Sequence, residues 1–379
     1  MELNECKGKR CLYWSSQNVN NNDGVSNKIK AHIKSLQHLG FNTNLLYPVR
    51  KENNSICYYL NDSEFVIQPN TRFIQRLSRV LLLIKLYRFV KKTNVKLIYV
   101  RYGADADSLL TRWLSSCKRN GCRIMLEIPT YPYDGEFNNL TKKQIKFRQN
   151  EVYYRNKLKN CIDCIITTSN VNPIFGVKTI NISNGIDPET IPVAKAIRIT
   201  DTVNLIAVAH IAFWHGFDRL IKGINNYYRN KHTINVNLTI VGGGHSDVIE
   251  ELTQMVKSYH LEKHVELIGP KMGSELDAVF VGKHMAVGCL ACHRKGITEV
   301  KSLKNVEYAT RGIPFMYSEN NTDFDSAPYV LKVPADDSDI DVNSIVDFLS
   351  IYDLSPQYVR NSVSHLSWNS QFETMIEEL

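Results

Sequence analysis

The stretch "EVKSLKNVEYATRGIPFMYS", residues 299 to 318, places two carboxylates eight residues apart, at Glu299 and Glu307. A short helical pattern between them leads into Gly312-Ile313-Pro314 and an apolar strand. A carboxylate can accept hydrogen bonds from two hydroxyl groups at once, and the N–H groups at a helix start can hold an anion. The same spacing is also compatible with a solvated helix face. The elements around the stretch must decide between these interpretations.

Length and composition set the class of the protein. A chain of 379 residues predicts two domains, and 43% hydrophobic with 22% charged residues is typical of a soluble globular protein. The start has no apolar segment long enough for a signal peptide, and the purest apolar run is "VLLLI" at 80–84. Nine cysteines without a secretory signal indicate reduced thiols. We expect a cytoplasmic protein.

Charge is distributed unevenly along the chain. Residues 1–190 hold 29 Lys and Arg against 15 Asp and Glu, whereas residues 191–379 hold 17 against 23. The basic half could meet a phosphate-bearing acceptor or an anionic membrane; nucleic acid is not expected, because no nucleic-acid-binding signature accompanies the charge. In segment 72–92, basic and aliphatic residues alternate. This predicts a packed crossover helix, with peripheral docking on the inner face of the plasma membrane as the alternative.

Strand-like and helix-like segments alternate throughout, which predicts an α/β fold of two doubly wound parallel sheets. The turn-rich stretch "ISNGIDPETIPVAKAIRITD" separates them. We predict a first domain at 1–187, a second at 188–364 and a final helix at 365–379. Open α/β sheets bind ligands at the carboxyl ends of their strands, so a cleft between the two domains is the expected site.

The opening stretch resembles retaining glycosyltransferases of the GT-B type in the large family-4 group (glycosyl transferases group 1). These enzymes carry a Glu, seven residues, a second Glu, and a helix that ends in Gly-x-Pro before a strand; the match here is Glu299, Glu307 and "RGIPFMYS". "SNGIDPETI", "LTIVGGGHSDVIEEL" and "VELIGPKMGSELDAVF" follow the family in the same order, and "SWNSQF" resembles its tail, a helix that crosses back to the first domain.

The resemblance implies roles for several residues. Glu299 would touch hydroxyls of the transferred sugar, and Glu307 would hold the ribose of the nucleotide. Ser302 and Leu303 would offer N–H groups to the diphosphate, and Gly24 and Gly243 would lie beside the donor in glycine-containing turns. The family's Arg and Lys for the diphosphate are replaced here by His210 and His215. Arg294 and Lys295 are the expected substitute cations.

The acceptor side is less specified. Candidates near strand ends of the first domain are Arg101, Tyr102, Glu127, Tyr131 and Asp134. The leaving phosphate can take the acceptor's proton in such enzymes, so no general base is assigned.

Two further motifs are better explained without a cofactor or a metal. Gly242-Gly243-Gly244 lacks the spacing of a dinucleotide fingerprint. "CLACH" at 289–293 fits a haem-attachment pattern. Its cysteines, Cys289 and Cys292, could also form a zinc site together with Cys161 and Cys164. Buried reduced thiols explain both cysteine pairs better.

Together these observations predict a hexosyltransferase-type enzyme. It would move a sugar from a UDP- or GDP-linked donor to a glycan or lipid-linked acceptor in surface polysaccharide biosynthesis. The nucleotide sugar is a co-substrate, and neither a cofactor nor a metal is expected. A catalytically silent GT-B subunit that stabilises a partner, and a nucleotide-sugar epimerase or hydrolase on the same fold, remain the alternatives.

Overall fold

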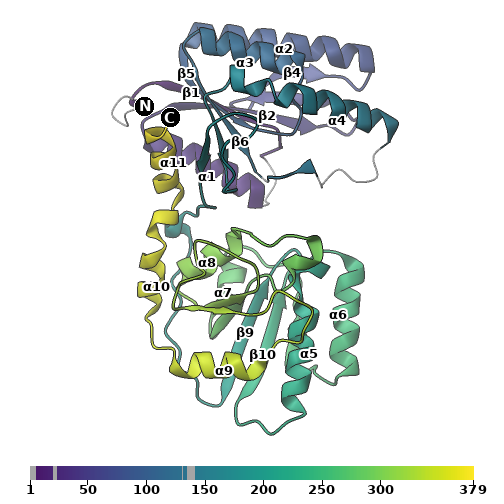
Figure 1. Ribbon diagram of the computed structural model, residues 1–379, viewed down its shortest axis with the longest axis vertical. Helices are drawn as coiled ribbons and strands as arrows, with labels where there is room; N and C mark the ends of the chain where they lie inside the picture. The colour runs from purple at the N-terminus through teal and green to yellow at the C-terminus, as the bar shows by residue number, and fades with distance from the viewer. Residues whose placement is uncertain (1–5, 20–23, 130, 135–140) are drawn as a thin grey trace. The chain divides into compact units, whose positions relative to one another are not determined.

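The computed structural model describes the chain except for residues 1–5, 20–23, 130 and 135–140. It divides into two compact units (Figure 1). Unit 1 comprises Met1–Ser183 with Trp368–Leu379, and unit 2 comprises Asn184–Ser367. These limits lie within a few residues of the boundaries predicted from the turn-rich stretch.

Unit 1 is built on an eight-stranded sheet in the order β4-β3-β2-β1-β5-β6-β7-β8. Its strands are β1 (Arg10–Ser15), β2 (Asn42–Arg50), β3 (Ile56–Leu60), β4 (Ser63–Gln68), β5 (Val95–Arg101), β6 (Arg123–Ile128), β7 (Cys164–Thr167) and β8 (Thr179–Asn181). All pairs are parallel except β2–β3 and β3–β4, which are antiparallel. The predicted parallel sheet therefore carries an antiparallel extension at one edge.

Helices cover both faces of this sheet. They are α1 (Gly24–His38), α2 (Arg72–Thr93), α3 (Ser108–Arg119), α4 (Lys142–Arg155) and α11 (Trp368–Glu377). Successive side chains of a strand point to opposite faces. Accordingly, Leu12 packs in the cluster that contains residues of α2 and α3, whereas Tyr13 packs in the cluster of α1 and α11 (Figure 1).

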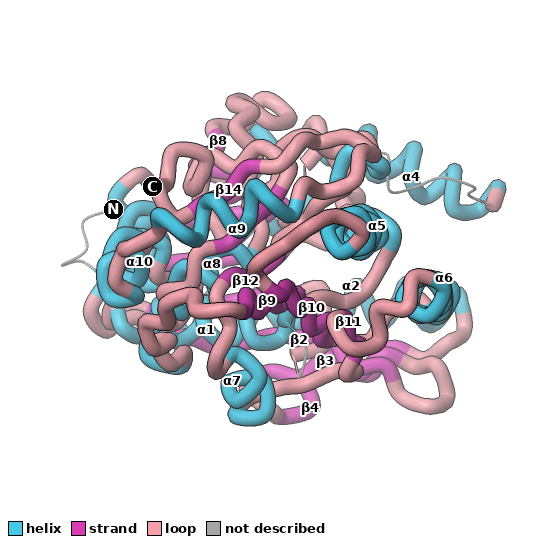
Figure 2. Tube along the Cα trace, turned by 90° about the horizontal axis from the view of Figure 1, so that it is seen from below, coloured by secondary structure: helices cyan, strands magenta, loops and turns pink. Residues whose placement is uncertain are grey.

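Unit 2 holds a six-stranded, fully parallel sheet in the order β11-β10-β9-β12-β13-β14. Its strands are β9 (Thr202–Val208), β10 (Asn235–Val241), β11 (Val265–Leu267), β12 (Met285–Val287), β13 (Phe315–Tyr317) and β14 (Val330–Lys332), and its helices are α5 (Phe217–Tyr228), α6 (Ser246–Ser258), α7 (Ser274–Phe280), α8 (Leu303–Arg311), α9 (Val342–Ile351) and α10 (Pro356–Ser362). Residues of α5, α6 and α9 pack on one face, and those of α7, α8 and α10 on the other (Figure 2).

Short 3₁₀ helices complete the structure. They are Leu158–Asn160, Pro188–Thr190, Phe213–His215, Cys292–Lys295 and Ser364–Leu366. The last of them interrupts the C-terminal segment, so α10 belongs to unit 2 and α11 to unit 1. Trp368 and Phe372 of α11 pack against His32 of α1, with ring centroids 4.3 and 5.0 Å apart. The predicted return of the C-terminal helix to the first domain is confirmed.

Candidate functional site

Helix α8 and the segment before it carry the two glutamates. Glu299 is exposed and forms a parallel bridge with Asn320. The helix is capped by Ser302 and ends at Gly312, whose φ of 76° is a left-handed C-cap. A side chain at Gly312 would meet the Pro356 carbonyl oxygen at 2.4 Å, so both backbone conformation and space demand glycine there. The predicted helix with its Gly-x-Pro end is thus present.

The start of α8 has backbone N–H groups that could bind an anion. In a parallel sheet, the chain leaves β12 at the carboxyl edge, passes through the loop containing Glu299, and enters α8 before β13. Among the described residues, none accepts a hydrogen bond from the backbone N–H groups of Ser302, Leu303 or Lys304. These N–H groups form the positive end of the helix dipole. A helix start of this kind can bind an anion such as a phosphate.

Glu307 is oriented by an ion-pair chain. Its Oε1 accepts hydrogen bonds from Arg311 Nε at 3.1 Å and Nη2 at 2.8 Å. Arg311 is also paired with Asp277 at 2.8 Å and lies over the ring of Phe280. No described residue bonds Oε2 of Glu307, and the side chain is 28% exposed. Glu307 therefore keeps one carboxylate oxygen for a ligand.

His215, which stands in the place of the family's lysine, does not carry a positive charge. The ring is buried, and its Nδ1 accepts the N–H of Ala212 at 3.1 Å. Burial, followed by the charge of Lys304, lowers the pKa of His215 to about 3. The imidazole is therefore neutral at physiological pH, with its proton on Nε2. His215 can offer one uncharged N–H group to a phosphate but no positive charge.

His210 lies on the exposed turn after β9, with its ring 6.1 Å from that of His245 at the start of α6. Trp214, which lies between His210 and His215 in the sequence, contacts the His245 ring edge-on, with ring centroids 5.6 Å apart. Lys295 Nζ lies 4.3 Å from the Trp214 ring centroid, so this predicted cation caps an aromatic face.

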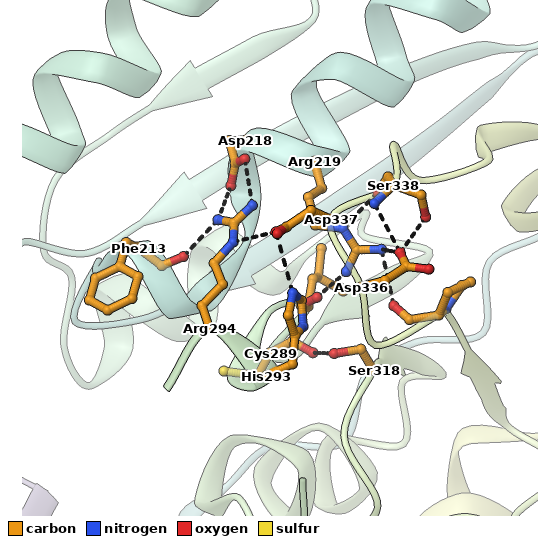
Figure 3. A network of polar contacts seen from close by, with 12 residues as sticks. Phe213, Asp218, Arg219, Cys289, His293, Arg294, Ser318, Asp336, Asp337 and Ser338 are labelled. Carbon is orange, nitrogen blue, oxygen red and sulfur yellow. Dashed lines mark hydrogen bonds and ion pairs between the residues drawn. The ribbon is translucent and has the colours of Figure 1, made fainter. Parts of the chain in front are cut away.

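Arg294 was expected to be a substitute cation for the diphosphate, but its guanidinium is already paired within the protein. Its guanidinium binds Asp218 through two hydrogen bonds of 2.8 and 2.9 Å, and its Nε donates to Asp337 at 2.7 Å (Figure 3). A further bond of 3.0 Å reaches the Phe213 carbonyl. Because two carboxylates already neutralise it, Arg294 anchors the turn 292–295 and is not available as a substitute for the missing Arg and Lys.

Arg219 of α5 is the neighbouring structural cation and is fully buried. It donates to the carbonyls of Ser338 at 2.7 Å and Pro334 at 3.0 Å, and also to that of Leu290 (Figure 3). Nothing in the sequence pattern singles Arg219 out, because arginine is a common residue on exposed helix faces. Its position shows that it fastens segment 334–338 to α5.

Replacing Arg219 with methionine is expected to lower the free energy of unfolding of the chain by about 3–5 kcal/mol, because the Leu290, Pro334 and Ser338 carbonyls lose the guanidinium that donates to them and Asp336 loses its ion-pair partner. Urea unfolding followed by circular dichroism measures this loss. The matched control is Lys222→Met on the same helix, whose side chain is 37% exposed and which should change stability by less than about 0.5 kcal/mol. Equal effects of the two variants would contradict the assigned role.

The glycine turn after β10 is required by close packing. A Cβ at Gly242 would lie 1.8 Å from the Ala209 oxygen, and one at Gly244 would lie 2.1 Å from the Ile211 oxygen. A Cβ at Gly243, the predicted donor residue, meets nothing within 4 Å. The outer glycines let two strand ends approach, whereas a donor-binding role of Gly243 stays a prediction.

In unit 1, Gly24 is the exposed first residue of α1, with open space around its Cα. Residues 20–23, which precede it, lie outside the described residues. The proposed contact of Gly24 with donor phosphates remains a prediction.

The acceptor candidates fall into two groups. Arg101 and Glu127 form a buried ion pair at the ends of β5 and β6, where they are register partners. Lys28 Nζ of α1 lies 3.3 Å from Glu127. Despite burial, these cations hold the pKa of Glu127 at about 2. The residues are 5% and 2% exposed and meet one another, so an acceptor would contact them only from the edge of this buried cluster.

The second group surrounds Glu151 of α4, which the sequence did not single out. Its Oε1 accepts hydrogen bonds from Tyr102 at 2.6 Å and Tyr133 at 2.8 Å. The more exposed candidates lie beside it: Asp134 is paired with Arg148 and Arg155, and the Tyr131 ring packs edge-on against Tyr133. Tyr131 and Asp134 are therefore the accessible acceptor candidates of the five.

His32 is a buried titratable group beside the first cluster. Its Nδ1 lies 3.0 Å from the Tyr13 hydroxyl. Burial lowers the pKa of His32 to about 3, and Lys28 and Arg101 add to this effect against the attraction of Glu127. The unfolded chain binds a proton at this position below about pH 6.5, whereas the folded chain does so only near pH 3. Stability contributed by the neutral imidazole is therefore lost as the pH falls.

We expect acidification from pH 7 to pH 5 to cost about 2 kcal/mol of stability through His32 alone. Thermal unfolding of the native chain and of His32→Phe at both pH values isolates this contribution as the difference in pH dependence. His38→Phe, at the exposed end of the same helix, should keep the native pH dependence. An unchanged pH dependence in His32→Phe would show that the residue is not buried in its neutral form.

No protein-family model matches the chain, and no curated protein matches it. Solved structures do resemble it over almost its whole length. A glycosyltransferase from Rickettsia africae has a TM-score of 0.67 at 12% identity, with 98% of this chain and 97% of that chain covered. HepE from Anabaena in complex with UDP has a TM-score of 0.61 at 11% identity, with 98% and 100% covered. Sucrose-phosphate synthase from Thermosynechococcus elongatus has 0.59 at 13%, with 97% and 94% covered.

At these identities the likeness shows the fold. The predicted GT-B architecture is confirmed, whereas the narrower assignment to family 4 stays a prediction. Within the described part of the chain, none of the helices is both long and apolar enough to cross a bilayer.

Proposed function

We propose that this chain is a retaining, metal-independent glycosyltransferase that moves a hexosyl group from a nucleoside diphosphate donor to a glycan or lipid-linked acceptor. The setting we propose is surface polysaccharide biosynthesis at the cytoplasmic face of a bacterial membrane. The observation that carries the proposal is the start of α8. There, the N–H groups of Ser302 and Leu303 have no acceptor among the described residues, and in sequence they lie between the exposed Glu299 and Glu307, whose Oε2 accepts no hydrogen bond from a described residue.

Each part of α8 matches one part of a nucleotide sugar. The N–H groups and helix dipole suit the diphosphate, and neutral His215 can add an uncharged donor. Oε2 of Glu307 can accept from a ribose hydroxyl, and Glu299 can accept from hydroxyls of the sugar. One of the fold neighbours, HepE, was solved with UDP and with UDP-glucose, which supports testing uridine donors first.

Calorimetric titration with UDP and GDP, followed by mass analysis of donor and acceptor products, tests the proposal. We expect one of the two nucleotides to bind at one site per chain and its sugar to appear on the acceptor. Absence of nucleotide binding in the folded chain would favour the silent subunit. Epimerised or free sugar formed without acceptor would favour the epimerase or hydrolase.

The surface of α2 supports the membrane setting. Its inner side is buried through Leu82, Leu83, Leu86 and Val90. Its outer side exposes Ile74 (45%), Leu77 (55%), Leu81 (47%) and Ile84 (44%), which recur at helical spacing. Exposed basic residues of the same helix include Arg76, Lys85 and Arg88, of which Lys85 also donates to the Phe65 carbonyl of β4 at 3.4 Å. We call Ile74, Leu77, Leu81 and Ile84 the α2 stripe.

A packed crossover helix with snorkelling cations explains the inner side of α2 but not the α2 stripe. An apolar stripe flanked by cations fits the interface of an anionic bilayer, where apolar burial and electrostatic attraction act together. Each Lys or Arg near such a surface contributes about 1 kcal/mol. The helix would lie on the membrane, not across it, and hold the enzyme near a lipid-linked acceptor.

We expect the chain to co-sediment with vesicles that contain anionic phosphatidylglycerol and not with vesicles of pure phosphatidylcholine. Leu77→Ser with Leu81→Ser should reduce the bound fraction at least about fivefold. Ile351→Ser, which removes an aliphatic side chain that is 82% exposed in unit 2, is the control and should bind normally. Unchanged binding of the double variant would exclude the α2 stripe as the contact.

A further inference from the structure

A buried group of potential metal ligands lies behind the candidate site. Cys289, Cys292 and Glu319 are 7%, 5% and 1% exposed, and their ligand atoms all lie within 4.8 Å of one another. The group joins two neighbouring strands: Cys289 follows β12, Glu319 follows β13, and the Ser318 N–H donates to the Cys289 carbonyl at 2.9 Å. It is the one such group of three within the described residues.

Two charged side chains at this place, Glu319 and Lys304, lack hydrogen-bond partners among the described residues, whereas the Cys289 thiol donates to the Trp214 carbonyl at 3.6 Å. Neither carboxylate oxygen of Glu319 has a hydrogen-bond partner among the described residues, although both are buried. The ammonium group of Lys304 is likewise buried without an acceptor in the described part of the chain. An unpaired buried carboxylate costs several kcal/mol unless a ligand compensates it. A ligand that pairs with the carboxylate and the ammonium group would remove this cost.

The donor set identifies the kind of ligand. Two sulfurs and one carboxylate oxygen suit a tetrahedral zinc ion, whose Zn–S bonds of about 2.3 Å place neighbouring ligands about 3.7 Å apart. The Cys-x-x-Cys spacing is the one that zinc sites commonly use. An anion would satisfy Lys304 but leave Glu319 unpaired, whereas a divalent cation satisfies the sulfurs and the carboxylate together.

We infer that Cys289, Cys292 and Glu319 bind one zinc ion, with a water molecule in the fourth position. On binding, each thiol releases its proton to solvent, and the sulfur lone pairs form the Zn–S bonds without any oxidation or reduction. Two thiolates and one carboxylate carry three negative charges, and zinc with the Lys304 ammonium carries three positive charges. Lys304 is thereby the counter-charge that makes the buried site neutral.

The zinc ion would be structural. Its ligands are buried, and they fasten the ends of β12 and β13 to each other at the point where the loop with Glu299 begins. This inference is independent of the proposed transfer reaction, because the ion need not touch the donor. It also differs from a site shared with Cys161 and Cys164, since those two cysteines belong to unit 1.

The test is zinc analysis of the full chain purified without added metal and without a histidine tag. Elemental mass spectrometry should find about one zinc per chain, and cobalt added to the chelator-treated protein should give thiolate-to-cobalt charge-transfer absorption. The cobalt measurement needs no variant, so it decides the question even if substitutions impair folding. We also expect zinc to raise the thermal midpoint of the chelator-treated chain.

Variants assign the ligands. Cys292→Ser and Glu319→Gln should each weaken zinc binding at least about tenfold in competition with a chromophoric chelator. Cys161→Ser, in the Cys-x-x-Cys pair of unit 1, is the matched control and should bind zinc like the native chain. The inference is overturned if the native chain shows neither zinc nor the cobalt–thiolate band, or if peptide mapping finds a disulfide between Cys289 and Cys292.

Discussion

Replacing Glu299 with glutamine is expected to lower the rate of sugar transfer by about 10²- to 10³-fold while leaving the affinity for the nucleoside diphosphate within about twofold of the native value. Under the proposed function, the Glu299 carboxylate binds only the sugar. Its negative charge would strengthen the hydrogen bonds to sugar hydroxyls as positive charge develops on the ring. Transfer is measured with the donor identified by titration, and affinity by calorimetry on the same preparations.

The separation of the two effects is the informative result. Glutamine keeps the shape of Glu299, and the residue is exposed, so folding should be unaffected. The control is Glu262→Gln, because Glu262 is exposed and lies just before β11, at the amino edge of the same sheet. This variant should transfer sugar at the native rate. Asp323→Asn is less suitable because the Asp323 carboxylate pairs with Lys301. A Glu299→Gln variant with native turnover would remove Glu299 from the site.

Replacing Glu307 with alanine should act on binding. We expect the affinity for the nucleoside diphosphate to fall by about 10- to 100-fold, because one charge-assisted hydrogen bond to ribose contributes roughly 1.5–3 kcal/mol and 1.4 kcal/mol corresponds to a factor of ten. The Arg311 guanidinium keeps Asp277 as its partner, so the buried cation is not left alone. Calorimetric titration of native and variant chains measures the change.

Two comparisons separate ribose binding from a general loss of charge. The Glu262→Ala variant removes one negative charge at the opposite edge of the sheet and should bind the nucleotide like the native chain. Titration of the Glu307→Ala variant with inorganic pyrophosphate, which lacks ribose, should also give the native affinity. If pyrophosphate binding falls with nucleotide binding, Glu307 acts on the α8 start and not on ribose.

Much of the fold follows from local sequence features. The apolar strands alternating with amphipathic helices predict two parallel sheets, and glycines such as Gly312 mark helix ends because few other residues adopt the left-handed conformation. The antiparallel β3 and β4 were not predicted. Both strands are short, five and six residues, and among the described strands β3 pairs with β2 and β4 while β4 pairs with β3, so their place at the sheet edge depends on tertiary packing.

Features of the candidate site that depend on neighbouring residues in the sequence could be predicted. Features that depend on ion pairs between distant segments could not. The helix that follows Glu299 and ends at Gly312 could be predicted because its pattern lies within one short stretch of the chain, while the roles of Glu299 and Glu307 stay predictions. The partners of Arg294 could not, since Asp218 and Asp337 lie 76 and 43 residues away in sequence. Burial of Lys304 and His215 was hidden for the same reason: desolvation depends on the surrounding elements and not on the residue type.

The central claim is that the start of α8 binds the diphosphate of a nucleotide donor. A crystal structure of the chain with the nucleotide that binds in calorimetry tests it most directly. We predict phosphate oxygens within hydrogen-bond distance of the Ser302 and Leu303 N–H groups, and a ribose hydroxyl on Oε2 of Glu307. Nucleotide bound elsewhere, with these N–H groups facing only water, would contradict the claim.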